Sequence, residues 1–325
     1  MRPLKFYPNL KRSQWGWRGL GDQLGKSLGV ETDYAESWEI SCHPNGLSVI
    51  EGEPHDGKTL VDLIEENPEK ILGRHADKKC FPLLIKFLDA NDRLSVQVHP
   101  NDEQAKKYRK GENGKTEAWV ILGADAKSCV YSGLKQNVTP DQLRTAITND
   151  NVELCLHSVP VAKADCLFIP AGTVHAIGEG VLVAEIQQSS DLTFRISDWG
   201  RVGTDGKPRE LHLEQAFECI NFSQGPVDPV KPVVEQNSAT LKTETLVECE
   251  QFVIRRHTFS GQFSLKSDDC FRVMMNLGGD CELDSEGERI PLVSGESTLI
   301  PAENTGVDIN PTGDPEVVLL ESYLP

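Results

Sequence analysis

The stretch Leu-Ser-Val-Gln-Val-His-Pro at residues 94–100 gives the first indication of how this chain folds. Apolar and polar residues alternate along it, and successive side chains of a β-strand point to opposite faces. Ser95, Gln97 and His99 therefore share one face of the predicted strand, and the intervening apolar residues, Leu94 among them, share the other. The stretch predicts a half-buried strand that carries two candidate metal ligands, Gln97 and His99, on one wall.

Two later stretches add candidate ligands. The sequence Lys-Thr-Glu-Ala-Trp at residues 115–119 places Lys115 and Glu117 on one side of a second strand. The sequence Phe-Ile-Pro-Ala-Gly-Thr-Val-His at residues 168–175 predicts a short apolar strand, a turn and then a strand that carries His175. The candidate ligands of one divalent ion are Gln97, His99, Glu117 and His175.

Composition limits the classes of protein to be considered. With 325 residues, 38% of them hydrophobic and 26% charged, the chain is typical of a globular protein with one large or two modest domains. It contains no apolar run of about 18 residues and no signal-type segment at its start, so we expect a cytoplasmic protein. The formal net charge of −17 disfavours nucleic acid and membrane surfaces as partners, and no obligate protein partner is evident.

The cysteines argue against two kinds of site. All nine are scattered along the chain, and none belongs to a Cys-x-x-Cys pair. This pattern is typical neither of a disulfide framework nor of a thiolate zinc site. We expect most of these cysteines to be small buried hydrophobic residues.

The predicted secondary-structure elements are mainly β-strands. Short strand segments fill residues 82–201, interrupted by a predicted helix at residues 139–147 that has Thr139 as its N-cap and proline at its first position. We expect residues 152–157 to continue this helical insert. Earlier, residues 59–67 have apolar positions at helical spacing and predict another helix.

Two sequence features after residue 209 predict a boundary between an N-terminal and a C-terminal domain. Residues 211–220 predict a connecting helix, and three prolines within residues 225–232 exclude regular structure there. From about residue 246 onward the chain is a series of short predicted strands with Gly and Asp turns, typical of a second sandwich or barrel. The expected division is listed by residue number: 1–222, a domain with an N-terminal segment and a helical insert at about 138–158; 223–245, a proline-rich crossover; 246–325, a second β-barrel.

The two halves also share short similar segments. The similar pairs are residues 120–125 with 275–280, and 167–172 with 298–303. When these pairs are superposed, Arg272 falls opposite Glu117 and Gly306 falls opposite His175. If both halves are the same barrel, only the first retains metal ligands.

Each candidate ligand also has an ordinary structural interpretation. A lone histidine on a strand is more often a hydrogen-bonded or surface residue than a ligand, and glutamine is a rare ligand. The joint occurrence of the four residues favours a metal site. Nitrogen and oxygen donors without thiolate suit Zn²⁺, although Mn²⁺, Co²⁺ and Fe²⁺ would also be accepted. One carboxylate with three neutral ligands leaves a net charge of about +1, and such an ion is strongly electrophilic.

Several of these stretches together resemble the type I mannose-6-phosphate isomerases in their short bacterial form. The stretches that carry the resemblance are residues 95–102, 115–119, 170–176 and 187–195. The resemblance implies two cupin-type (jelly-roll) β-barrels and an isomerase of mannose 6-phosphate and fructose 6-phosphate. It also implies one zinc ion bound by the four candidate ligands in the first barrel.

The resemblance also implies roles for residues around the metal. Arg195 matches the active-site arginine of the family, and Lys115 matches a lysine beside the substrate. Glu185 has the parity to line the same pocket, and Ser95 shares the face of Gln97. We therefore expect Arg195, Lys115 and Glu185 to be catalytic, and Ser95, Lys115 and Arg195 to bind substrate. Without the family, a surface lysine, a solvated arginine, a structural ion pair of Glu185 and a buried serine are equally reasonable interpretations.

The expected reaction moves a proton between C1 and C2 of an open-chain sugar through an enediol whose oxygen a metal ion stabilises. Candidates for the proton-transferring group are Lys115, Arg195, Glu185 and a metal-bound water. The alternative functions are a catalytically silent sugar-binding or regulatory cupin, another metal-dependent sugar isomerase, and a metal-dependent oxygenase. The glutamine ligand disfavours the oxygenase, which commonly uses two histidines and one carboxylate.

Overall fold

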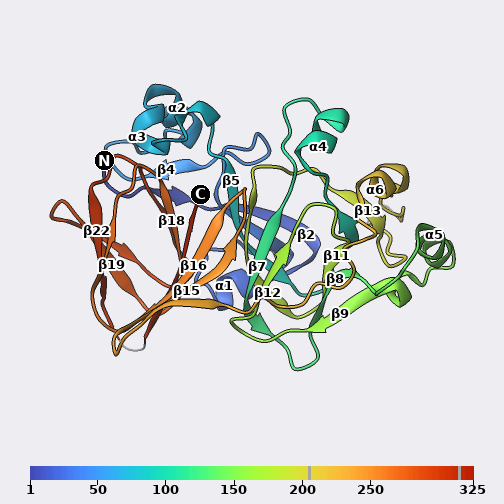
Figure 1. The fold of residues 1–325 in the computed structure, drawn as a ribbon. Coiled ribbons are helices and arrows are strands. Elements are labelled where there is room, and N and C mark those ends of the chain that lie inside the picture. The colour runs from blue at the N-terminus through green and yellow to red at the C-terminus, as the bar shows by residue number, and fades with distance from the viewer. Residues whose placement is uncertain (204–205, 314–315) are drawn as a thin grey trace.

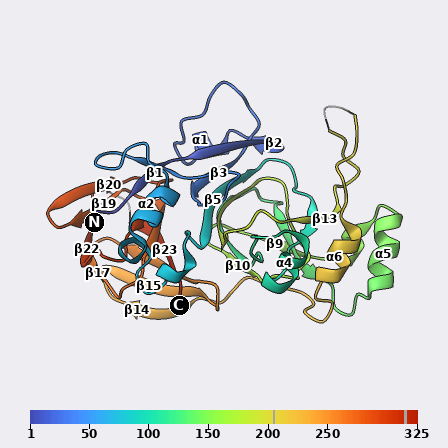
Figure 2. The same cartoon turned by 90° about the horizontal axis from the view of Figure 1, so that it is seen from above.

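The computed structural model describes residues 1–203, 206–313 and 316–325, and strands make up most of its regular structure. These residues form two antiparallel β-sandwiches that lie side by side (Figure 1). Seen from above, both termini lie beside the sandwich of the C-terminal half, far from the helices at the other end (Figure 2). The expectation of a mainly β fold with two jelly rolls is confirmed.

The first sandwich pairs a six-stranded sheet with a five-stranded sheet. In spatial order the larger sheet contains β10 (Cys166–Ile169), β7 (Glu117–Ala124), β12 (Val181–Gln188), β5 (Leu83–Ala90), β3 (Tyr34–Ile40) and β2 (Asn9–Trp17). The smaller sheet contains β13 (Phe194–Ser197), β6 (Val96–Val98), β11 (His175–Ile177), β8 (Cys129–Leu134) and β9 (Leu156–Pro160). The expected metal ligands come from both sheets.

The second sandwich repeats this plan. Its larger sheet contains β14 (Val233–Asn237), β15 (Leu241–Glu248), β16 (Val253–Phe259), β23 (Val317–Tyr323), β18 (Arg272–Gly278) and β21 (Ser297–Ile300). Its smaller sheet contains β17 (Phe263–Lys266), β22 (Gly306–Pro311), β19 (Cys281–Ser285) and β20 (Glu288–Leu292). Strands β14 to β23 follow the same spatial order as β2, β3 and β5 to β12, which confirms the internal similarity. In this correspondence Arg272 on β18 takes the place of Glu117, and Gly306 on β22 takes the place of His175.

Four hydrophobic clusters hold the sheets in layers. One cluster, with Trp119 and Ile177, lies between the sheets of the first sandwich, and another, with Phe259, lies between those of the second. A third cluster joins the two sandwiches through their larger sheets and includes Phe87 and Phe271. Because both halves contribute to this cluster, the sandwiches share a buried core.

The chain ends and the crossover differ in detail from the expected division. Strand β1 (Lys5–Tyr7) pairs with β4 (Val49–Glu51), and Leu4 bridges to Leu299 of the second sandwich. Residues 225–232 are irregular, as expected for a proline-rich run, but β14 and part of β15 fall within residues 223–245. We therefore propose that the second sandwich begins near residue 233. The N-terminal segment, which the expected division assigns to residues 1–222, also pairs with the second sandwich through Leu4.

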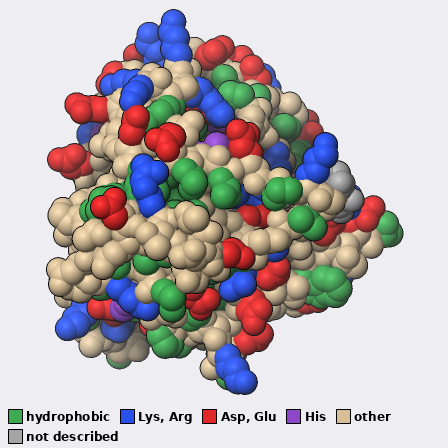
Figure 3. All heavy atoms as spheres, turned by 90° about the vertical axis from the view of Figure 1, so that its right-hand side faces the viewer, with side chains coloured by type: hydrophobic (Ala, Val, Ile, Leu, Met, Phe, Trp, Pro, Cys, Tyr) green, Lys and Arg blue, Asp and Glu red, His purple; other side chains and the backbone are tan. Residues whose placement is uncertain are grey.

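Among the described residues, three short helices pack against the core shared by the two sandwiches, and three more pack on the five-stranded sheet in the cluster that includes Val96 and Val98. They are α1 (Gly19–Asp22), α2 (Leu60–Glu66), α3 (Pro68–Leu72), α4 (Asp102–Tyr108), α5 (Pro140–Thr148) and α6 (Leu213–Cys219), with 3-10 turns at Ala76–Lys78 and Val152–Cys155. Across residues 1–203, 206–313 and 316–325, no helix has the length and apolar character needed to cross a membrane. Figure 3 shows acidic and basic side chains interspersed on the face that carries α5 and α6.

The predicted helices at residues 59–67, 139–147 and 211–220 are confirmed as α2, α5 and α6, with slightly different ends. The prediction for residues 152–157 is wrong in part. Only one 3-10 turn forms there, and Leu156 already begins strand β9, whose residues pair with β8. Pairing with a neighbouring strand overrides the local helical pattern, as is common for short segments.

Helix α5 allows a direct test of its capping box. The Thr139 hydroxyl accepts a hydrogen bond from the Gln142 amide at 3.3 Å, and Gln142 Oε1 accepts one from the Thr139 amide at 2.9 Å. We expect Thr139→Ala to lower the free energy of unfolding by about 1 kcal/mol, because an N-cap partner is lost. Thr148→Ala in the exposed last turn serves as the control and should change it by less than about 0.5 kcal/mol. Urea unfolding measures both values, and equal effects would contradict the capping role.

Candidate metal centre

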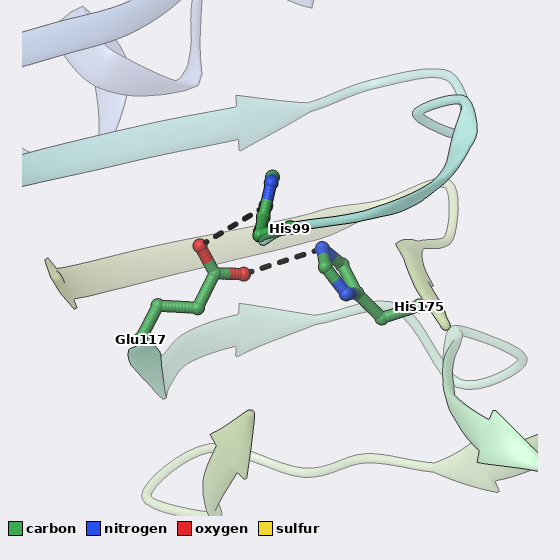
Figure 4. Close-up of side chains that lie close together, drawn as sticks. All are labelled: His99, Glu117 and His175. Atoms are coloured by element: carbon green, nitrogen blue, oxygen red, sulfur yellow. Dashed lines mark ion pairs between the residues drawn. The ribbon is translucent and has the colours of Figure 1, made fainter. Parts of the chain in front are cut away.

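Three predicted ligands meet inside the first sandwich. His99 lies directly beyond the end of β6, Glu117 is the first residue of β7, and His175 is the first residue of β11. His99 Nε2 lies 3.5 Å from Glu117 Oε2, and His175 Nε2 lies 3.4 Å from Glu117 Oε1 (Figure 4). One ligand atom from each residue lies within 4.8 Å of the other two. The three side chains therefore surround one point.

Backbone carbonyls fix the orientation of both imidazole rings. His99 Nδ1 lies 3.1 Å from the Leu192 carbonyl oxygen, and His175 Nδ1 lies 2.9 Å from the Thr173 carbonyl oxygen. A carbonyl can only accept, so each Nδ1 carries the proton and each Nε2 presents a lone pair to Glu117. Burial lowers the pKa of His175 to about 4, and burial together with the Lys115 charge lowers the pKa of His99 well below its usual value. Both rings are therefore neutral at pH 7, as a metal ligand must be.

The buried polar atoms at this point fit a divalent cation. Glu117 is fully buried, and within the described ranges its two carboxylate oxygens and His99 Nε2 form no hydrogen bond, although Lys115 makes an ion pair with Glu117 Oε2. Buried atoms of this kind normally have partners, and an ion that accepts lone pairs would satisfy all three at once. The Gln97 amide lies 3.3 Å from His175 Nε2, and a half-turn of the amide directs its oxygen to the same point. The donors that meet here are two imidazoles and a carboxylate, and the Gln97 amide lies beside them.

The ligand group lies beside a cavity of about 290 Å³, and of the four proposed ligands only Gln97 lines this cavity. Every other predicted site residue also lines this cavity: Ser95, Lys115, Glu185 and Arg195. Lys115 Nζ lies 3.0 Å from Glu117 Oε2. Lys115 therefore connects the cavity to the point where His99, Glu117 and His175 meet.

Leu94 corrects one detail of the predicted strand. It also lines the cavity, although we expected it to share the opposite face with Val96 and Val98. Strand β6 begins only at Val96, and Leu94 packs in the interior cluster of the sandwich. The alternation of side chains therefore does not extend back to Leu94, whereas Val96 and Val98 are buried on the outer side as expected.

The cavity also contains a buried lysine, Lys86, that the sequence patterns did not predict as a site residue. Lys86 points inward from β5, and its Nζ lies 3.3 Å from both Glu36 and Glu185. Burial alone lowers its pKa, but the charges of Glu36 and Glu185 raise the pKa above its usual value, so Lys86 is protonated. Trp119 Nε1 donates to Glu185 Oε2 at 3.1 Å, which fixes the carboxylate further. A single lysine within the apolar run Leu-Leu-Ile-Lys-Phe-Leu at residues 83–88 was the available signal.

A second missed cation lies at the edge of the cavity beside Arg195. Arg209 lines the cavity, and its Nε donates to Asp198 Oδ2 at 2.8 Å. Arg201 donates to Asp198 Oδ1 at 2.7 Å. Burial raises the pKa of Asp198, but hydrogen bonds from the two arginines lower it below its usual value, so the carboxylate stays ionised. Burial and the nearby Arg209 lower the pKa of Arg195. Arg195 and Arg209 therefore give one end of the cavity a positive charge, although the net charge of the whole chain is negative.

Known proteins with the same fold and sequence pattern identify the family. Residues 4–134 match the family model for the catalytic domain of type I phosphomannose isomerase, and residues 242–318 match the model for the cupin domain of mannose-6-phosphate isomerase. A mannose-6-phosphate isomerase of Bacillus subtilis is 36% identical over 300 residues, which cover 92% of this chain and 93% of that protein. The chain belongs to the type I mannose-6-phosphate isomerase family.

Further members of the mannose-6-phosphate isomerase family are similar to this chain over nearly its full length. A mannose-6-phosphate isomerase of Streptococcus mutans is 32% identical over 320 residues, which cover 98% of each chain. A crystal structure of a mannose-6-phosphate isomerase from Bacillus subtilis superposes on the whole chain with a TM-score of 0.91 and 30% identity, and both chains are covered completely. The predicted family and the cupin fold are confirmed, and this family consists of metal-dependent aldose–ketose isomerases.

Proposed function

We propose that this chain interconverts mannose 6-phosphate and fructose 6-phosphate with one divalent ion held by Gln97, His99, Glu117 and His175. The observation that carries the proposal is the convergence of His99, Glu117 and His175 on one point, beside a cavity that Lys115 and Arg195 line. When bound there, a divalent ion supplies positive charge opposite the oxygen that becomes negative in an enediol. Zinc is the ion that we propose, because imidazole and carboxylate donors without thiolate suit it.

The residues that line the cavity can supply the other groups that the reaction needs. Lys115 and Arg195 carry positive charge into the cavity and can stabilise an anionic sugar oxygen or phosphate. Glu185 is the carboxylate among the three proposed catalytic groups, so it can accept a proton without first losing one. Lys86 and the Trp119 indole hold Glu185 in place from two sides. We therefore propose Glu185 as the base and Arg195 and Lys115 as the groups that stabilise charge on the substrate.

The test of this function is an isomerase assay with three sugars, in the presence and absence of a chelator. Mannose 6-phosphate should be converted, whereas glucose 6-phosphate and unphosphorylated mannose should be poor substrates. The chelator should abolish turnover, and added Zn²⁺ should restore it. Absence of turnover in metal-loaded protein would favour a silent sugar-binding cupin. Preference for another aldose would favour a different metal-dependent sugar isomerase.

We propose that Arg209 and Ser95 bind the phosphate group at the cationic end of the cavity. Arg209→Ala should raise the KM for mannose 6-phosphate by about 10- to 100-fold, because a charge-assisted hydrogen bond is lost. The weak activity toward unphosphorylated mannose should change little, since that sugar carries no phosphate. Steady-state kinetics with both sugars measures the two effects, and a parallel loss with both would show that Arg209 supports the fold instead.

We infer a reducing, cytoplasmic compartment for this activity. All nine cysteines of the chain are free thiols, and most of them are buried. Proteins that fold in oxidising compartments commonly use such residues as disulfides. Labelling of the nine thiols in protein isolated from cells under acidic quenching would test this inference.

A further inference from the structure

Two of these cysteines lie beside each other outside the metal centre. Cys42 follows the end of β3 at Ile40, and Cys80 precedes β5, which begins at Leu83. The Cys80 thiol donates a hydrogen bond to the Cys42 carbonyl oxygen, and the Sγ and oxygen atoms are 3.9 Å apart.

The surroundings of the pair give a small reagent access to Cys80. Both cysteines line a cavity of about 520 Å³ that the metal centre does not share. Cys42 is buried, whereas Cys80 is partly exposed to this cavity. Lys78, Arg109 and Lys110 line the same cavity and place positive charge near the thiols. The cavity therefore suits an anionic thiol reagent.

The local chemistry assigns different roles to the two sulfurs. The hydrogen bond from Cys42 lowers the pKa of Cys80, against opposing effects of burial and of the Glu65 charge. The same hydrogen bond and burial raise the pKa of Cys42 far above its usual value. His43 and Glu112, which also line the cavity, pair with each other at 3.2 Å. Because Cys80 is the more exposed of the two and its pKa is lowered, we expect Cys80 to react first and Cys42 to follow.

We propose that Cys42 and Cys80 form a reversible disulfide when the protein meets a small disulfide oxidant such as oxidised glutathione. The Cys80 thiolate attacks one sulfur of the oxidant, forms a mixed disulfide and releases one glutathione thiolate. Cys42 then loses its proton to that thiolate and attacks the Cys80 sulfur, which releases the second glutathione. Two protein thiols are oxidised, and one glutathione disulfide is reduced to two thiols. Once Cys80 is in the mixed disulfide, the charge that held the proton on Cys42 is gone.

The bridge would join two segments that lead into the active site. Strands β3 and β5 are neighbours and carry Glu36 and Lys86. The loop after Cys42 also reaches the cavity of the metal centre, because Asn45 Nδ2 donates to Asp191 Oδ2 at 2.7 Å. The disulfide would therefore fasten this loop to the start of β5. The proposal rests on these contacts and is independent of the isomerase activity.

The test is peptide mapping of the metal-loaded protein after treatment with oxidised glutathione and rapid alkylation. We expect a cross-linked peptide pair that contains Cys42 and Cys80 and is lighter by two hydrogens, and we expect dithiothreitol to release it. Before oxidation, Cys80 should react with maleimide about tenfold or more faster than Cys249, a partly buried thiol whose pKa burial raises.

Two variants complete the test. In Cys42→Ser the mixed disulfide of Cys80 should accumulate, because the second thiol is absent. Cys249→Ser is the matched control and should form the bridge as fast as the wild type. A stable mixed disulfide on Cys80 of the wild type would overturn the proposal. So would two free thiols at positions 42 and 80 under conditions that oxidise Cys249, and both results come from the wild type alone.

Discussion

Substitution of His99 by alanine is expected to remove the metal ion and to reduce isomerase activity by at least about 100-fold, since even loss of an outer-shell partner commonly costs 10- to 100-fold. His99 Nε2 faces Glu117, and its ring is fixed by the Leu192 carbonyl. Alanine removes this lone pair and leaves the buried Glu117 carboxylate with only Lys115 and His175 of the neighbours described above. Metal analysis by mass spectrometry and the mannose 6-phosphate assay measure the two losses.

The matched control for His99 is His157→Ala. His157 lies on β9 and pairs with Asp228 at the surface, so its loss should leave both metal content and activity within about twofold of the wild type. Circular dichroism should show that both variants retain their strands. If His99→Ala kept a full complement of metal and normal turnover, the assignment of the ligands would be wrong.

The second large effect is expected for Arg195→Ala. Arg195 extends from β13 into the cavity, and its Nη1 donates to the Glu210 carbonyl at 2.8 Å. Within the described ranges its Nε is buried without a hydrogen-bond partner, so it has a donor left for substrate. We expect kcat/KM to fall by about 10²- to 10³-fold, as for removal of one charge-stabilising donor. The metal content should not change, because Arg195 is not one of the proposed ligands.

Two further variants define the role of Arg195. Arg289→Ala removes an exposed arginine of the second sandwich and should leave the kinetics unchanged. Arg195→Lys keeps the charge but loses the planar donor geometry, so it should recover only part of the activity. A wild-type rate in Arg195→Ala would show that this arginine has no part in the reaction. Loss of metal in the same variant would show that it supports the centre instead.

The sequence predicts the residues of the metal centre well because each signal is local. Alternation from Val96 onward places Gln97 and His99 on one face, and a turn before His175 starts a new strand. The sandwich then brings these faces against Glu117. The similarity between the two halves is also local, and the repeated strand order explains it.

Local sequence patterns do not identify Lys86 and Arg209 as residues of the site, and the reasons differ. Lys86 sits in an apolar run, and its inward direction depends on pairing with β12, where Glu185 is its cross-strand neighbour. Arg209 lies outside the strands, and Asp198 holds its guanidinium at the cavity. The shared core between the sandwiches depends on contacts such as that of Phe81 with Phe271, whose ring centroids lie 5.1 Å apart. These contacts join residues far apart in the sequence, which local patterns do not encode.

The central claim is that one divalent ion sits between His99, Glu117 and His175. The most direct test is anomalous X-ray diffraction from crystals of the active, metal-loaded protein, recorded on both sides of the zinc absorption edge. We predict a single strong peak in each chain, about 2.0–2.2 Å from the Nε2 atoms of both histidines and from a Glu117 oxygen. An active crystal with its peak elsewhere, or with no peak at these three side chains, would contradict the claim.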